Sequence, residues 1–124
     1  VRELRRFDSP VQYTGRRVAT DLQLHGQTLR RGDLVVPLIG SSNRDPARHA
    51  VPDQLDVAGR DGASISFGTG PHVCIGALLT RIEAEITFRQ VLQRWPNLRL
   101  AGGPPQWADN PAYRGLLSLD VVTG

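Results

Sequence analysis

Apolar residues recur at a helical spacing in the longest patterned stretch of this chain, residues 75–95. They occupy the i, i+3, i+4 and i+7 positions that form one face of a helix. The residues of this face are Ile75, Leu78, Leu79, Ile82 and Ile86, continued by Val91, Leu92 and Trp95. Pro96 then ends the pattern, because proline does not continue a helix. The spacing predicts a helix over 75–95 that buries this face.

Shorter elements are expected before this helix. Residues 1–7 are typical of the end of a helix, and Pro10 disfavours helical backbone in the residue before it. Residues 18–24 and 34–39 carry strand-like apolar runs, and the His-Gly-Gln sequence at 25–27 is typical of a tight turn. The pattern therefore predicts a helix end followed by short strands.

The remaining segments are irregular or lie at the C-terminus. Residues 43–64 are rich in Pro, Asp and Gly and predict a long irregular segment. Residues 98–122 contain a Gly-Gly-Pro-Pro run and a strand-like Leu-Leu-Ser-Leu sequence at 116–119. With 124 residues, mixed helix and strand and no internal repeat, we expect one α+β unit, residues 1–124, without an internal domain boundary.

Composition narrows the class of protein. Apolar residues make up 40% of the chain, enough for a modest core, and no run approaches the roughly 18 apolar residues of a membrane span. All 15 basic residues are arginine, but they are scattered and the net charge is only +3, so we expect no nucleic-acid partner. The chain has neither a signal-peptide pattern nor an initiator methionine, so we expect a piece of a longer protein without a secretion signal.

Cys74 is the only cysteine, which fits a reducing cytoplasm, and it lies in a glycine-rich run at 67–76. Three interpretations compete: a small buried apolar residue, a nucleophile with His72 as its base, and a single thiolate ligand to haem iron. A nucleophile lacks an evident third residue to orient the base. Zinc is poorly supported, because its sites usually need four nitrogen or sulfur ligands and the chain has one cysteine and three histidines.

The run at 67–76 reads Phe-Gly-Thr-Gly-Pro-His-Val-Cys-Ile-Gly and resembles the cysteine-ligand loop of the cytochrome P450 haem-thiolate monooxygenases, Phe-Gly-x-Gly-x-His-x-Cys-x-Gly. All six fixed positions match. Residues 79–83 are similar to the family's Leu-Ala-Arg-x-Glu continuation, with Thr80 in place of alanine. Residues 3–6 resemble the Glu-x-x-Arg sequence of its K helix, and the segments at 15–21, 43–46 and 52–56 resemble later family segments in the same order.

The resemblance implies the C-terminal portion of the cytochrome P450 fold, in its bacterial, soluble and cytoplasmic branch. Its parts would be the end of the K helix, short β-strands, the meander, the cysteine-ligand loop, the long L helix and a C-terminal β hairpin. The implied cofactor is haem b, iron protoporphyrin IX, with Cys74 as the proximal ligand of the iron. Gly68 and Gly76 would let the loop pass close to the sulfur and the macrocycle, and Phe67 would pack beside the haem.

The resemblance also implies partners for the haem propionates. His72 would hydrogen-bond one of them. Alignment from Asp21 and Gly26 selects Arg16 as a second partner, whereas counting from the Arg-Val-Ala sequence selects Arg17. Neighbours on a strand point to opposite faces, so only one of the two can serve, and we favour Arg16.

Glu3 and Arg6 are expected to be structural, because residues at i and i+3 share a helix face. In the family this pair holds the K helix to the meander through a third residue, usually arginine. Gln54 stands at that position here, and glutamine has neither the charge nor the bidentate fork of a guanidinium. We therefore expect a weaker brace, with Arg44 or Arg48 as substitutes.

The resemblance predicts insertion of one oxygen atom of O₂ into a small organic substrate. Electrons would come from a reductase through a ferredoxin on the proximal face, where Arg81 would help to dock an acidic partner. The family's distal helix, with its acid–alcohol pair, has no counterpart in this sequence. The alternative is therefore a truncated, non-catalytic haem-binding or interaction module. In either case the isolated chain is expected to be inactive and to self-associate through uncovered apolar surface.

Overall fold

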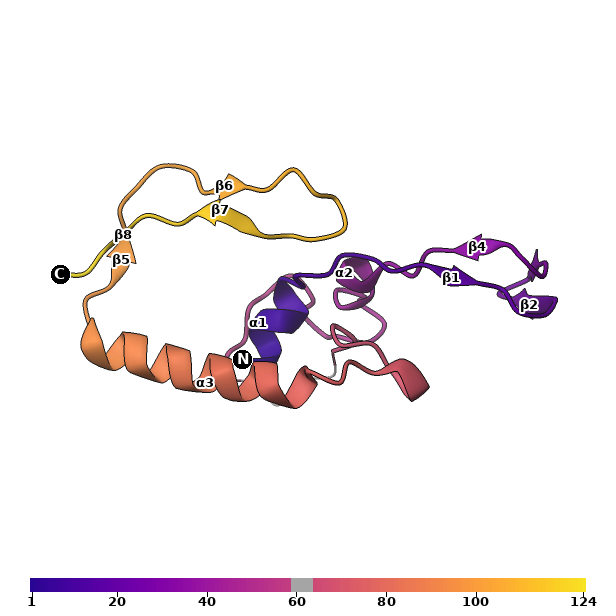
Figure 1. Cartoon of the computed structure of the whole chain (residues 1–124), viewed down its shortest axis with the longest axis horizontal. Coiled ribbons are helices and arrows are strands. Elements are labelled where there is room, and N and C mark those ends of the chain that lie inside the picture. The colour runs from indigo at the N-terminus through magenta and orange to yellow at the C-terminus, as the bar shows by residue number, and fades with distance from the viewer. Residues whose placement is uncertain (59–63) are drawn as a thin grey trace.

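The computed structural model describes residues 1–58 and 64–124. Helix α1 (Arg2–Phe7) lies near the centre of the molecule, and helix α3 (Ala77–Arg94) runs past it, as Figure 1 shows. A narrow two-stranded arm projects at one end, and a long hairpin forms the C-terminal part. Helices combined with antiparallel strand pairs confirm the α+β expectation. Among the described residues, no helix combines the length and the apolar character needed to cross a membrane.

The projecting arm contains four short strands: β1 (Arg16–Arg17), β2 (Leu22–Leu24), β3 (Gln27–Leu29) and β4 (Leu34–Val35). β1 pairs with β4 and β2 pairs with β3, both antiparallel. His25 and Gly26, which join β2 to β3, have positive φ angles of 46° and 77°. A two-residue hairpin turn requires such backbone, so the tight turn predicted at 25–27 is confirmed.

Two predicted strands are shorter than expected. Residues 18–24 contribute only β2, and residues 34–39 contribute only β4. Pro37 carries no amide hydrogen and cannot donate to a ladder, so β4 ends before it. Ile39, expected in the strand, instead begins the short helix α2 (Ile39–Ser42).

The helix predicted over 75–95 is confirmed as α3, which begins at Ala77 with Gly76 at its N-cap. The prediction that its apolar face is buried is wrong for this chain. Six of its eight predicted residues are exposed, from 43% at Ile82 to fully exposed at Ile75, and Val91 and Trp95 are half-buried. Figure 1 shows the reason, since α1 lies beside only one part of α3 and the C-terminal hairpin stands away from it.

The C-terminal part contains four strands: β5 (Arg99–Leu100), β6 (Gln106–Trp107), β7 (Leu116–Ser118) and β8 (Val121–Val122). β5 pairs with β8 and β6 pairs with β7, which confirms the C-terminal hairpin. Arg114 fastens the hairpin to the segment after α1. Its backbone amide donates to the carbonyl of Pro10 (2.7 Å), and its Nε donates to Asp8 (2.6 Å).

The interior of the described chain is mostly polar. Ile39 is its buried apolar residue, whereas the buried polar residues are Arg6, Ser9, Asn43 and His49. These four come from α1, from the residues just after it, and from the irregular segment that follows α2. Irregular structure predicted at 43–64 is observed at 43–58 and at Ser64, and residues 59–63 lie outside the described residues. The polar interior therefore holds this segment against α1.

Candidate functional site

An open cavity of about 590 Å³ brings together most of the residues that sequence reasoning selected. Cys74, His72, Phe67, Gly68 and Arg16 all line it. Much of the remaining wall comes from α1, from the segment between α1 and β1, and from one side of α3. Residues that are far apart in the sequence thus converge on one hollow.

The cysteine loop is shaped by glycine and by its own backbone hydrogen bonds. Gly68 and Gly70 have φ angles of 72° and 74°, a left-handed conformation that a side chain would strain. The amide of Cys74 donates to the carbonyl of Phe67 (2.9 Å) and closes the loop. A short 3₁₀ helix, η1 (Gly70–His72), lies inside it. This geometry presents Cys74 just before the N-terminus of α3.

Cys74 is exposed, so its interpretation as a small buried apolar residue is wrong for this chain. Gly76 does not line the cavity, but a Cβ added to it would lie 3.7 Å from the sulfur. That is an ordinary van der Waals distance, and the φ of Gly76 is −80°. The backbone at this position therefore does not itself require glycine.

The donor set fits a metal whose other ligands come from a cofactor. Within 1–58 and 64–124, no three His, Cys, Asp or Glu side chains gather where they could hold a metal ion. One thiolate facing an open hollow is what haem needs from a protein, because the porphyrin supplies four nitrogen ligands itself. In the same part of the chain, no hydrogen bond joins His72 to Cys74, which disfavours the nucleophile–base interpretation.

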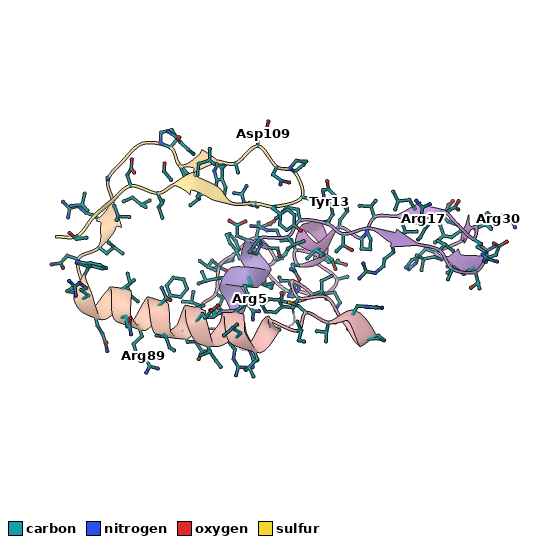
Figure 2. All side chains as sticks on the ribbon, in the orientation of Figure 1. Arg5, Tyr13, Arg17, Arg30, Arg89 and Asp109 are labelled. Carbon is teal, nitrogen blue, oxygen red and sulfur yellow. The ribbon has the colours of Figure 1, made fainter. Side chains whose placement is uncertain are left out.

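The two candidate arginines of β1 lie differently. Arg16 lines the cavity, where its Nη1 donates to Thr14 Oγ1 (3.1 Å) and to the carbonyl of Gly15 (3.0 Å). Arg17, labelled on the arm in Figure 2, donates instead to the carbonyl of Gly32 (2.8 Å) and is absent from the cavity wall. The geometry favours Arg16 over Arg17.

Glu3 and Arg6 form a bidentate ion pair. Arg6 Nε and Nη2 donate to the two carboxylate oxygens of Glu3 at 2.8 and 2.7 Å. The other donors of Arg6 reach three backbone carbonyls, those of Asn43 (2.9 Å), Pro52 (2.9 Å) and Gln54 (3.0 Å). All five N–H groups of the guanidinium are thus used.

The brace expected to be weak at Gln54 is therefore complete, and that expectation is wrong. Gln54 takes part through its backbone carbonyl, and the amide of Asp56 donates to Glu3 (3.1 Å). Arg44 does not substitute, because it donates to Asp53 and to the carbonyl of Phe7. Among the described residues Arg48 has no ion pair with Glu3 either. Backbone groups do what a third side chain was expected to do.

The charge of Glu3 is favoured by these contacts. The hydrogen bond from Arg6 lowers the pKa of Glu3, and burial opposes this effect. The amide of Asp56 and the nearby charges of Arg6 and His49 lower the pKa further. Glu3 therefore stays ionised to a lower pH than a free glutamate.

Sequence reasoning missed a hydrogen-bonded hub at Asn43. Its Nδ2 donates to Ser9 Oγ (2.6 Å) and Ser66 Oγ (2.9 Å), and both serine hydroxyls donate to the carbonyl of Arg5 (2.9 and 2.8 Å). Its Oδ1 accepts from the amide of Ile65 (2.9 Å). The hub fixes α1 to the residues immediately before Phe67. The available signal was that Asn43 begins the recognised segment at 43–46 and that Ser66 directly precedes the motif at 67–76.

Comparison with known proteins identifies the fold. The cytochrome P450 family model matches residues 1–106. The chain is 40% identical to the biotin biosynthesis cytochrome P450 of Bacillus subtilis, over 98% of this chain and 31% of that protein. It is 42% identical to the polyketide biosynthesis cytochrome P450 PksS of the same organism, with the same coverage.

Solved structures agree with these sequence matches. The chain superposes with a TM-score of 0.95 on P450BioI crystallised with an acyl carrier protein carrying hexadec-9Z-enoic acid, at 37% identity. That match covers 99% of this chain and 32% of the other. The chain thus spans about a third of the length of these relatives, and its fold is that of a C-terminal P450 portion.

Proposed function

Because the chain belongs to the cytochrome P450 family, we propose that it is the haem-ligand portion of a haem-thiolate monooxygenase. The reaction would insert one oxygen atom of dioxygen into an organic substrate. One observation carries the proposal: Cys74, His72, Phe67 and Arg16 line a single open cavity. A thiolate, two cationic or hydrogen-bonding groups and an aromatic ring are the groups that a haem with two propionates would need.

We assign the roles residue by residue. Haem b bound here would supply the iron at which dioxygen is activated. Cys74 would bind that iron through its sulfur. His72 and Arg16 would donate to the propionates, since charge-assisted hydrogen bonds to carboxylates are strong. Phe67 would cover one side of the macrocycle and exclude water from the sulfur.

The backbone around Cys74 would stabilise a thiolate. Its amide is held by the carbonyl of Phe67, which fixes the orientation of the loop. The sulfur stands next to the N-terminus of α3, an 18-residue helix whose dipole places partial positive charge there. Gly68 lines the cavity without a side chain. These features would hold the sulfur in place as an iron ligand.

The same part of the chain offers a basic surface to an electron donor. Burial lowers the pKa of Arg5, and the nearby positive charges of Arg2 and Arg81 lower it further. The three arginines therefore lie close together. Arg81 also has an ion pair with Glu85 at 3.7 Å. We propose that Arg2 and Arg81 help to dock an acidic ferredoxin, because complementary charge steers such encounters. The carrier-bound fatty acid belongs to the relative in which it was seen.

Turnover with isotopically labelled dioxygen tests the function. The full protein, supplied with a reductase and a ferredoxin, should transfer one labelled atom into the product, and Cys74→Ser should abolish this transfer. Arg17→Ala is the control that should leave the transfer intact, because Arg17 lies outside the cavity wall. Haem binding without any transfer of label would favour the non-catalytic module instead.

A further inference from the structure

Arg5 is the residue beside the site that neither the family pattern nor the proposed function uses. It projects from α1, and Figure 2 labels it near the place where α1 and α3 pass each other. Its guanidinium carbon lies 4.2 Å from the centroid of the Phe67 ring. Both residues line the cavity that contains Cys74. A cation at this distance from an aromatic face is in cation–π contact.

The charge of Arg5 has no counter-ion among the described residues. Its Nε is buried without a hydrogen-bond partner, and no ion pair joins its side chain to a carboxylate there. The nearest charges acting on it are those of Arg2 and Arg81, which are also positive. Arg6, the next residue, differs from Arg5, because every N–H group of its guanidinium has a hydrogen-bond acceptor.

Hydrogen bonds also fix the main chain of Arg5 relative to the cysteine loop. Its carbonyl accepts hydrogen bonds from Ser9 Oγ (2.9 Å) and from Ser66 Oγ (2.8 Å), and Ser66 directly precedes Phe67. Phe67 in turn accepts the amide hydrogen of Cys74 (2.9 Å). Main chain and side chain thus both fix Arg5 relative to the sulfur ligand.

We infer that Arg5 is a positioning residue that holds an uncompensated positive charge against Phe67 and thereby raises the reduction potential of haem bound at Cys74. The inference rests on the proposed function. One-electron reduction of a haem-thiolate unit, with the electron supplied by an external reductant, adds negative charge to it. A fixed cation in a partly desolvated position stabilises that charge more than a solvated one would. Charge and burial near the iron are among the properties by which a protein sets the reduction potential of haem.

Spectroelectrochemical titration of the full, haem-loaded protein tests this inference without enzymatic activity. Arg5→Gln removes the charge and keeps a polar, unbranched side chain. At a fixed electrode potential we expect the ratio of reduced to oxidised haem to fall about tenfold, equivalent to about 59 mV. Arg5→Lys should restore most of the ratio. Arg2→Gln changes the net charge equally from an exposed position of α1, and we expect a much smaller change.

Equal changes for Arg5→Gln and Arg2→Gln, or no change for Arg5→Gln, would overturn the inference. Should Arg5→Gln fail to hold haem, Arg5→His keeps the test decisive, because its charge is switched by pH within one protein. The midpoint potential of Arg5→His should then fall, as pH rises through the imidazole range, by more than that of the unsubstituted protein. Matching pH profiles would contradict the inference. A wild-type protein without a thiolate-ligated haem spectrum would instead refute the proposed function.

Discussion

The polar interior around Arg6 and Asn43 and the apolar face of α3 show opposite patterns of burial. Arg6 is 3% exposed and Asn43 is 1% exposed, whereas Ile86 on α3 is 51% exposed. Charged and amide groups are buried because each finds hydrogen-bond partners nearby. Most of the apolar face of α3 is left exposed by the other described residues. Hydrogen bonding thus organises the region behind the cysteine loop, and α3 uses only part of the hydrophobic burial available to it.

Removing Arg6 should break the polar interior most severely. Arg6→Ala leaves the carboxylate of Glu3 and three carbonyls without their donor, and breaking a buried ion pair typically costs about 3–5 kcal/mol. Chemical denaturation of the full protein measures the free energy of unfolding. Arg30→Ala is the control, because Arg30 pairs with Asp21 on the solvent-exposed arm, and we expect little change from it. A comparable loss from both variants would contradict the special role of the interior.

Asn43→Ala should have the next largest effect. It removes two donated hydrogen bonds to serines and the acceptor for Ile65, so a loss of about 1–3 kcal/mol is expected. The fraction of protein that retains bound haem should fall as well, since the hub holds the residues before Phe67. Asn110→Ala, which alters an exposed turn, serves as the comparison. Unchanged haem retention in Asn43→Ala would show that the hub does not contribute to haem binding.

Acidification should weaken the same region through Glu3. Its folded-state pKa lies below the ordinary value of 4.5, so its ionised form stabilises the fold. This contribution is fully present above pH 4.5 and is lost as pH falls through the lowered folded-state pKa. Unfolding experiments at several pH values should show less acid sensitivity in Glu3→Gln, which cannot titrate. Identical acid profiles would show that Glu3 does not couple to stability.

Polar substitutions on α3 should have the smallest effect on the fold of the isolated chain. Leu78→Gln combined with Ile82→Gln replaces exposed apolar side chains, and exposed substitutions usually change stability by within about 0.5 kcal/mol. Their effect should appear in association instead. We propose that the isolated chain self-associates through this face, so sedimentation should show oligomers that the double variant lacks. A monomer at all concentrations without any substitution would rule this out.

Sequence reasoning predicted the positions of helices and turns better than the packing around them. The spacing of apolar residues located α3, and His25-Gly26 located a hairpin turn, because these signals are local. The burial of α3 was wrong, because helical periodicity indicates which face is apolar and does not supply what covers it. Strand ends depended on Pro37, whose missing amide limits pairing.

The same holds for the candidate site: local motifs were predicted correctly, whereas contacts between distant segments were not. The motif at 67–76 selected Cys74, His72 and Phe67, and the structure brings them to one cavity. The brace at Gln54 was misjudged, because a side-chain pattern cannot show that backbone carbonyls receive the donors of Arg6. Sequence reasoning also missed Arg5, for a related reason. It occupies an unspecified position of the Glu-x-x-Arg pattern, and only its contact with Phe67 reveals it.

The absorption spectrum of the reduced, carbon-monoxide-bound full protein tests the central claim most directly. If the Cys74 thiolate binds the haem iron, the band should appear at the wavelength that gives the family its name. In Cys74→His it should move to the position typical of histidine-ligated haem. A wild-type protein that binds haem without the thiolate band, or a Cys74→His variant that keeps it, would contradict the assignment of Cys74 as the ligand.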